Sequence, residues 1–350
     1  YGMIANIDEN MGRLEDFLVK NGLKDNTIVI FSSDNGSRSP EATMIWNGGM
    51  RGHKQELWDG GHRVHCYFRW PQAGFKTGRD VNVLTEVQDI APTLLELCNI
   101  KPANLYPMDG VSLVGLLRDE VWPHADRKLV IQYRNSCKPW DNAAVASEKW
   151  RVLKEKDNLT LCDLAKDPHQ DRNVAGQFGK VLQDLSRFYD GWHKVAYAEF
   201  LKIRYIHLGD PGVPEVDLYA NDWNGDYCDW KDNLIAGKAV GSWDIEVETP
   251  GEYKVELSRW PFESGKTLTE GWSLDGGKKS SSGETGARPI AKARLLIADQ
   301  DKTMETKAVD TSAAFTLALK PGSTKLTAQF LDAQGKVLCG AFYVKAKFTK

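Results

Sequence analysis

A chain of 350 residues is long enough for two or three compact domains, because a single hydrophobic core stops growing at about 250–300 residues. Its 41% apolar and 27% charged residues are typical of a folded globular protein and argue against a disordered or fibrous chain. The net charge of −3 offers no basic excess for nucleic acid, and no apolar run reaches the roughly 18–20 residues that span a membrane.

The chain begins at Tyr1, with neither an initiator methionine nor an apolar leader, so we expect a fragment whose export signal would lie upstream. The six cysteines are scattered and form no CxxC or other close metal-ligand spacing. Such residues are mostly buried apolar side chains, although one or two disulfides stay open if the protein is exported.

The first elements indicate an α/β domain. Apolar residues recur at helical spacing from Ile4 to Leu18, which predicts an amphipathic helix packed on a larger body. The apolar run Thr27–Phe31 is typical of a parallel strand covered on both faces, and it ends in the polar loop 32–36. Because ligands of such sheets bind beyond the carboxyl ends of strands, this loop lies where chemistry is expected.

Further elements follow in chain order. We expect a strand at Arg63–Trp70, a helix that starts near Asp89 with an oxygen of that residue as its cap, strands within Lys128–Gln132 and Ala143–Leu153, and a long helix along the stripe Val174–Trp192.

The last third alternates apolar and polar residues between turns, which predicts a β-sandwich. Pro250-Gly251 separates the alternating runs Trp243–Val247 and Tyr253–Leu257, which indicates a hairpin. Five tryptophans could stack on sugar rings, although aromatics in sandwiches are more often core, and we assign Trp243 and Trp260 to the core. The five are Trp223, Trp230, Trp243, Trp260 and Trp272.

Two short segments carry the candidate chemistry. Asp34 and Asn35 provide the hard oxygen ligands that Ca²⁺ or Mg²⁺ prefers, at the end of a predicted strand. The glycine-rich segment Asn47–Val64 would let backbone approach a ligand closely, and Lys54 within it offers a compact positive charge for an oxyanion.

These segments resemble the sulfatase family of the alkaline phosphatase superfamily. The family pattern pairs an NTIVIFTSDNG strand and loop with an LRGGKGSLYEGGxRVP segment, and the resemblance covers more than half the chain. The matching segments lie in the family's order: Ile7–Gly12, Asn26–Gly36, Met50–Lys54 through Pro71, Asp89–Leu95, Asp109–Leu113 and Leu161–Pro168.

The resemblance implies a fold and a site. The fold would be the C-terminal portion of a sulfatase α/β domain (1–118), a small antiparallel sheet with a long helix (119–205) and an all-β sandwich (206–350). Asp34 and Asn35 would bind the active-site cation, usually Ca²⁺ with Mg²⁺ as an alternative, and Lys54 would contact the sulfate. A formylglycine hydrate would attack sulfur, and the sulfated hemiacetal would then release sulfate.

The chain departs from the family in three ways. No stretch matches the formylglycine motif, since the segment 137–141 has Asp141 where Arg is required, so the nucleophile would lie upstream and the chain alone would be inactive. The remaining cation ligands would also lie upstream. His62 and His65 replace an apolar residue and Pro, and we expect His53 or His62 to line the pocket for the alcohol or sugar portion rather than to bind zinc.

The sequence therefore predicts part of a sulfuric ester hydrolase that acts on a sulfated small molecule or glycan, in the periplasm or outside the cell. It would need the N-terminal half of the same protein to complete its site, and no nucleic acid partner is expected. Two alternatives stay open: a phosphatase or phosphonate hydrolase of the same superfamily, and a non-catalytic carbohydrate-binding protein on a sulfatase scaffold.

Overall fold

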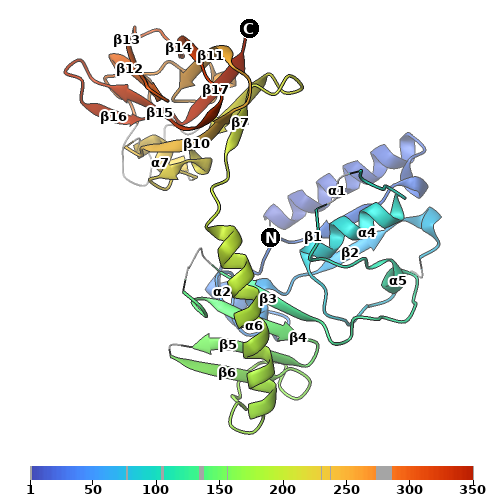
Figure 1. Ribbon diagram of the computed structural model, residues 1–350. Helices are drawn as coiled ribbons and strands as arrows, with labels where there is room; N and C mark the ends of the chain where they lie inside the picture. Colours follow the sequence, from blue (N-terminus) through green and yellow to red (C-terminus); the bar gives the residue numbers. More distant parts are fainter. Residues whose placement is uncertain are drawn as a thin grey trace. The chain divides into compact units, whose positions relative to one another are not determined.

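The computed structural model describes residues 2–75, 78–103, 106–133, 138–155, 157–229, 231–236, 238–272 and 286–349. The chain divides into two compact units, Tyr1–Phe200 and Leu201–Lys350 (Figure 1). Trp230 and Cys137, which the sequence singled out, lie outside the described residues.

The first unit opens with the predicted helix, α1 (Gly2–Lys20). Its carboxylate Glu15 pairs with Lys24 at 2.6 Å and with Arg69 at 2.8 Å, which ties the helix to the strands beside it. Within these bounds Leu18 is the one buried residue of the helix. Most of the apolar stripe faces outward within the described structure, including Met3, Ile4, Ile7, Leu14 and Phe17.

Strand β1 (Val29–Ser32) pairs antiparallel with β2 (Cys66–Arg69), and these two strands form a sheet of their own among the described residues. The predicted parallel strand, covered on both faces, is therefore wrong here. An apolar run reports only that a strand is suited to burial, so it cannot give strand direction or the number of neighbours. Phe31 and Tyr67 are exposed on this pair and stack with His65, whose ring lies 5.2 Å from that of Phe31.

Short helices connect and flank these strands. They are η1 (Lys24–Asn26), α2 (Pro40–Ile45), α3 (Asp59–His62), η2 (Pro71–Ala73), η3 (Val87–Asp89), α4 (Ile90–Leu97) and α5 (Val114–Leu117). The strand predicted from Arg63 begins only at Cys66, because α3 runs to His62 and Arg63 is its C-cap.

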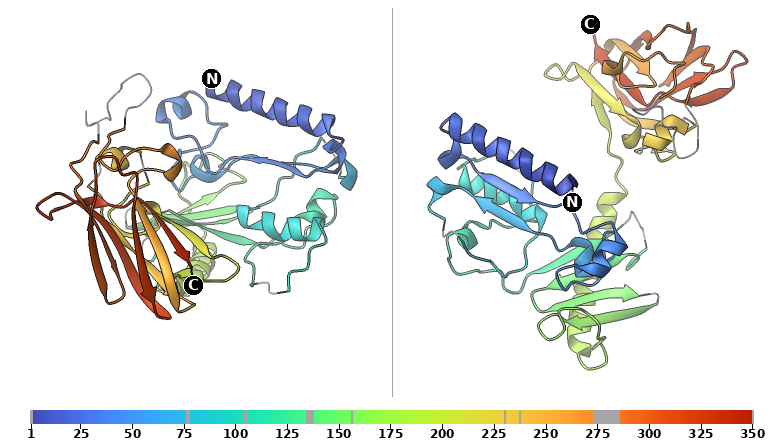
Figure 2. Two further views of the ribbon diagram at one scale, coloured as in Figure 1. Left: turned by 90° about the horizontal axis from the view of Figure 1, so that it is seen from above. Right: turned by 180° about the vertical axis from the view of Figure 1, so that it is seen from behind.

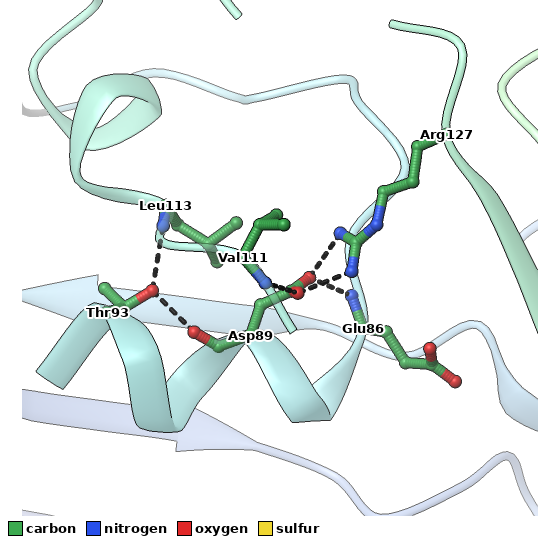
Figure 3. Close-up of polar contacts among 6 residues, drawn as sticks. All are labelled: Glu86, Asp89, Thr93, Val111, Leu113 and Arg127. Carbon is green, nitrogen blue, oxygen red and sulfur yellow. Dashed lines mark hydrogen bonds and ion pairs between the residues drawn. The ribbon is translucent and has the colours of Figure 1, made fainter. Parts of the chain in front are cut away.

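The helix predicted near Asp89 is α4, but the Asp89 carboxylate does not cap it. Instead the fully buried carboxylate accepts two hydrogen bonds of 2.6 Å from Arg127, one of 2.9 Å from the Val111 amide and one of 2.8 Å from the Glu86 amide (Figure 3). Thr93 extends the cluster by accepting from the Leu113 amide at 2.8 Å. A buried carboxylate needs such partners, so this cluster joins α4 to the chain just before the next sheet.

That next sheet is the predicted small antiparallel sheet, with strands β3 (Lys128–Gln132), β4 (Ala143–Ser147), β5 (Trp150–Glu155) and β6 (Asn158–Asp163) in sequential order. The predicted long helix is α6 (Gly179–Phe200), and it lies across one face of the sheet (Figures 1 and 2). Leu185 and Tyr189 of the helix pack on Val145 and Val152 of the sheet. Tyr189 also accepts a 2.9 Å hydrogen bond from the Trp140 amide.

The second unit is rich in β-structure, as predicted. Its strands are β7 (Ile206–Leu208), β8 (Glu215–Tyr219), β9 (Asn224–Gly225), β10 (Gly241–Val247), β11 (Gly251–Ser258), β12 (Lys292–Ile297), β13 (Gln300–Glu305), β14 (Ala313–Leu319), β15 (Gly322–Leu331), β16 (Val337–Gly340) and β17 (Tyr343–Phe348). Its short helices are η4 (Ala220–Asp222), α7 (Lys231–Ala236) and η5 (Phe262–Ser264).

These strands form two sheets that share one hydrophobic core. One sheet has the order β13-β12-β15-β10-β7, with β16 and β9 paired to its members, and the other has the order β14-β11-β17-β8. Strands β10 and β11 lie in different sheets, so the predicted hairpin is wrong. Both apolar faces point into the common core across the two layers, an arrangement that gives the same alternation as a hairpin.

The tryptophans of this unit support the core rather than a sugar surface. Trp243 and Trp260 are at most 1% exposed, which confirms their assignment to the core, and Trp223 is also buried. Trp272 is half-buried, with its ring 5.7 Å from that of Trp260.

Candidate functional site

The two candidate segments lie side by side in the first unit. The loop after β1 donates a 3.0 Å hydrogen bond from the Gly36 amide to the Gly61 carbonyl. In return the Lys54 amide donates a 2.8 Å bond to the Ser37 carbonyl. These backbone contacts bring the Asp34-Asn35 loop beside the Lys54 loop, although the segments are separate in the sequence.

Glycines make this approach close. A Cβ on Gly36 would lie 1.8 Å from the Gly60 carbonyl oxygen, and a Cβ on Gly61 would lie 2.1 Å from the Glu56 carbonyl oxygen. Gly60 also donates a 2.7 Å hydrogen bond to the Arg51 carbonyl. The short helix α3 is therefore the backbone platform on which both loops rest, and any larger residue at these positions would separate them.

Asp34 and Asn35 are held near the tip of β1. The Asn35 side-chain amide donates a 2.6 Å hydrogen bond to one Asp34 carboxylate oxygen, and the Ser33 hydroxyl donates to the Asn35 carbonyl at 3.0 Å. The Asp34 carboxylate is exposed and has no cationic partner among the described residues. Carboxylate and amide oxygens fit a hard divalent cation.

This pair offers only part of a cation shell. Ca²⁺ takes six to eight oxygen ligands, and the described residues contain no group of three or more His, Cys, Asp or Glu side chains placed to hold a metal. Further ligands would have to come from water, substrate or residues outside those described.

Lys54 is half-buried, and its ammonium forms no hydrogen bond or ion pair with any residue that the structure describes. The neighbouring Gln55 has φ = 80°, a left-handed conformation that costs a non-glycine residue energy. Such strain persists only where surrounding contacts fix the backbone, so the chain holds the lysine at a defined place on the loop.

His53 is already engaged by its own loop. One ring nitrogen, Nδ1, lies 2.9 Å from the Lys54 carbonyl oxygen, and Nε2 lies 3.7 Å from a Glu56 carboxylate oxygen. The His53 amide donates to the same carboxylate at 3.0 Å. These contacts brace the turn that carries Lys54.

His62 faces the interior. Its Nε2 lies 2.9 Å from an Arg151 guanidinium nitrogen, and because a guanidinium can only donate, the imidazole is neutral with its proton on Nδ1. Burial and then the Arg151 charge lower the pKa of His62 to about 4. A nitrogen committed in this way is not free for a substrate, so the predicted contact with a sugar would have to use another part of the ring.

Sequence analysis did not identify Asp59 and Arg151 as partners. The Arg151 guanidinium forms a 2.6 Å ion pair with the Asp59 carboxylate and donates a 3.1 Å bond to the Leu57 carbonyl. Asp59 stands inside the glycine-rich segment, but its partner lies on strand β5 of the small sheet, and no local pattern reports such a distant pairing. A second link joins the same sheet region to the loop, because Arg51 donates a 2.7 Å bond to the Gln170 carbonyl.

Comparison with known proteins finds similarity to sulfatases. Residues 1–100 match the model of the sulfatase family. The uncharacterized sulfatase YdeN of Escherichia coli is 30% identical over 149 residues, 41% of this chain and 26% of its own length. The ulvan-active sulfatase of Formosa agariphila is 30% identical over 182 residues, 51% of this chain and 34% of its own. This region of the chain is therefore similar to the sulfatase family.

Two further similarities cover the same part of the chain. The N-acetylglucosamine-6-O-sulfatase of Bacteroides thetaiotaomicron is 24% identical over 199 residues, 54% of this chain and 34% of its own length. The crystal structure of Ps i-CgsB aligns with a TM-score of 0.49 and 26% identity, over 55% of this chain and 42% of that one. The chain thus spans about a quarter to a third of the length of these curated relatives.

No helix among the described residues is long and apolar enough to cross a membrane. The described cysteines, Cys66, Cys98, Cys162, Cys228 and Cys339, all carry free thiols.

Proposed function

We propose that this chain supplies part of the active site of a sulfuric ester hydrolase. Asp34 and Asn35 would hold a divalent cation, Ca²⁺ or Mg²⁺, and Lys54 would bind a sulfate oxygen. The observation that carries the proposal is the pair of backbone hydrogen bonds, Gly36 to Gly61 and Lys54 to Ser37, which sets the loop of Lys54 beside the loop of Asp34 and Asn35.

The chemistry of sulfate ester cleavage fits these groups. Negative charge gathers on the equatorial oxygens and on the leaving oxygen in the transition state, so fixed positive charge stabilises it. A bound cation would supply part of that charge. Lys54 supplies the rest as a compact ammonium.

The nucleophile of the reaction would be a formylglycine on a segment upstream of this chain, which would also bring the remaining cation ligands. The open faces of α1 and of the β1–β2 pair are consistent with that arrangement, because they leave apolar side chains without cover in the described structure. On this proposal the chain by itself has no sulfatase activity, and the N-terminal half of the same protein completes it.

A sulfated glycan is the proposed substrate class, and the periplasm or the cell exterior is the proposed location. Support comes from the relatives, which include an N-acetylglucosamine-6-O-sulfatase and an ulvan-active sulfatase. The alternative of a carbohydrate-binding protein loses its main support, since Trp223, Trp243 and Trp260 are buried and cannot stack on a sugar.

An assay of sulfate release tests the proposal. The full-length protein should release sulfate from an aryl sulfate, and a chelator should abolish that activity until Ca²⁺ is restored. Lys54→Ala should lower kcat/KM at least about a hundredfold, as loss of an oxyanion-stabilising group does. Lys149→Ala is a matched control, since this exposed lysine lies in the bend between β4 and β5. Phosphate release with no sulfate release would favour a phosphatase instead.

A further inference from the structure

Arg151 contacts more groups than its ion pair with Asp59 requires. It lies on β5 of the small sheet, and its side chain is 5% exposed. It contacts three partners within residues 57–62: the Asp59 carboxylate, the Leu57 carbonyl and the His62 ring. All three flank or form α3. One guanidinium therefore fixes this short helix from outside the loop region.

Helix α3 in turn carries both candidate loops. Gly60 donates to Arg51 at the start of the Lys54 loop, and Gly61 accepts from Gly36 at the end of the Asp34-Asn35 loop. No other helix in the described part of the chain makes backbone hydrogen bonds to both loops. A four-residue helix is too short to hold its own position by helical hydrogen bonds, so its place depends on tertiary contacts.

We propose that Arg151 is a positioning residue of the sulfate ester site: its guanidinium clamps α3 and thereby sets the spacing between Lys54 and the Asp34-Asn35 pair. This inference rests on the proposed function for its catalytic consequence, but the clamp itself does not. The planar guanidinium suits the role because its several donors can satisfy a carboxylate, a carbonyl and an imidazole together, which a lysine ammonium on a flexible stem cannot do.

The unit contains a matched control. Arg127 is also a nearly buried arginine in a 2.6 Å pair with a buried carboxylate, Asp89, and its side chain is 9% exposed. The Asp89 cluster binds the Val111 amide, and through Thr93 the Leu113 amide, but its hydrogen bonds among the described residues do not extend to either candidate loop. Loss of each arginine should therefore loosen a different set of amides.

Amide hydrogen exchange in the full-length protein tests the clamp without any need for activity. In Arg151→Met the Gly36, Lys54 and Gly60 amides should exchange at least about tenfold faster, while those of Val111 and Leu113 keep their protection. Arg127→Met should show the opposite pattern. Equal acceleration of both sets in both variants, or unchanged exchange at Gly36, Lys54 and Gly60 in Arg151→Met, would overturn the inference.

A conservative variant covers the case in which Arg151→Met does not fold. Arg151→Lys keeps the charge for Asp59 but cannot also span Leu57 and His62, so the same three amides should exchange faster than in the wild type and kcat/KM for an aryl sulfate should fall about tenfold. Arg127→Lys should leave kcat/KM within about twofold. If the wild type has no sulfatase activity, the proposed function fails while the exchange pattern still decides the clamp.

Discussion

The two units differ in how completely they bury their apolar residues. In the second unit the inward faces of both sheets meet in one continuous core, and Trp243, Val255 and Phe330 are fully buried. In the first unit the small sheet and α6 are closed in the same way, but α1 and the β1–β2 pair expose large apolar side chains such as Phe17 and Tyr67. The family match, residues 1–100, coincides with the part whose apolar faces are open. This difference shows that an amphipathic pattern predicts a helix or strand reliably. It does not show which other element packs on the apolar face, and only the structure gives that.

Truncating aromatics should show this contrast most strongly. Phe330→Ala in the second unit should lower the free energy of unfolding by about 3–5 kcal/mol, because it opens a cavity in a sealed core. Phe17→Ala on the exposed face of α1 should change the free energy of unfolding of this 350-residue chain by no more than about 0.5 kcal/mol. Denaturant unfolding measures both. A large loss for Phe17→Ala would mean that α1 is covered.

Removal of an ion pair should cost more stability in the first unit than in the second, the reverse of the result for aromatic residues. The buried pairs of the described residues, Asp89 with Arg127 and Asp59 with Arg151, lie in the first unit. Asp89→Ala leaves the nearly buried Arg127 without a carboxylate and should cost about 3–5 kcal/mol of unfolding free energy. Asp301→Ala removes the partner of Arg294 at an exposed pair in the second unit and should leave the melting temperature unchanged within error. Thermal unfolding of the two variants decides between them, and comparable shifts would contradict the account.

His62 should make the first unit sensitive to acid. Its pKa is lowered from 6.5 to about 4 in the fold, so the unfolded chain binds a proton that the folded chain does not over that interval. The free energy of unfolding therefore keeps its full value above about pH 6.5. It falls as the pH drops toward 4, by up to about 2–3 kcal/mol. His62→Gln keeps an acceptor for Arg151 without titrating, and it should flatten this part of the stability profile. An unchanged slope in that variant would place the sensitivity elsewhere.

Thiol labelling should give the smallest effect, a difference in rate with no change in stability. Cys66 and Cys98 of the first unit are exposed, whereas Cys228 and Cys339 of the second are buried, and burial raises the pKa of each buried thiol to about 11. At pH 8 a disulfide reagent should modify Cys66 and Cys98 at least about tenfold faster than the buried pair. Peptide mass spectrometry would assign the labelled sites, and equal rates would show that the core of the second unit opens readily.

Local pattern was sufficient for much of the fold. Helical spacing located α1 and α6, a continuous apolar run located β1, and alternation identified the inward faces of β10 and β11. Local pattern failed where the prediction depended on which strand pairs with which. The alternation around Pro250 is the same for a hairpin and for two strands that face each other across a core, and only the pairing of β10 with β15 separates the two.

The residues of the candidate site also fall into those that the sequence could predict and those that it could not. Asp34, Asn35 and Lys54 could be chosen from sequence because their types and spacing suit a cation and an oxyanion, and their roles stay predictions. Arg151 could not be found, because it meets His62 across 89 residues and nothing near it in the sequence marks an arginine that points inward. Glycines such as Gly61 were assigned to ligand approach, but the contacts here show them allowing one backbone to approach another.

A crystal structure of the full-length protein with Ca²⁺ and a sulfated ligand would test the central claim most directly. The account predicts a cation bound by oxygens of Asp34 and Asn35 at about 2.3–2.6 Å, with the Lys54 ammonium within hydrogen-bond distance of a sulfate oxygen. A cation bound elsewhere, or a Lys54 side chain directed away from the sulfate, would contradict it.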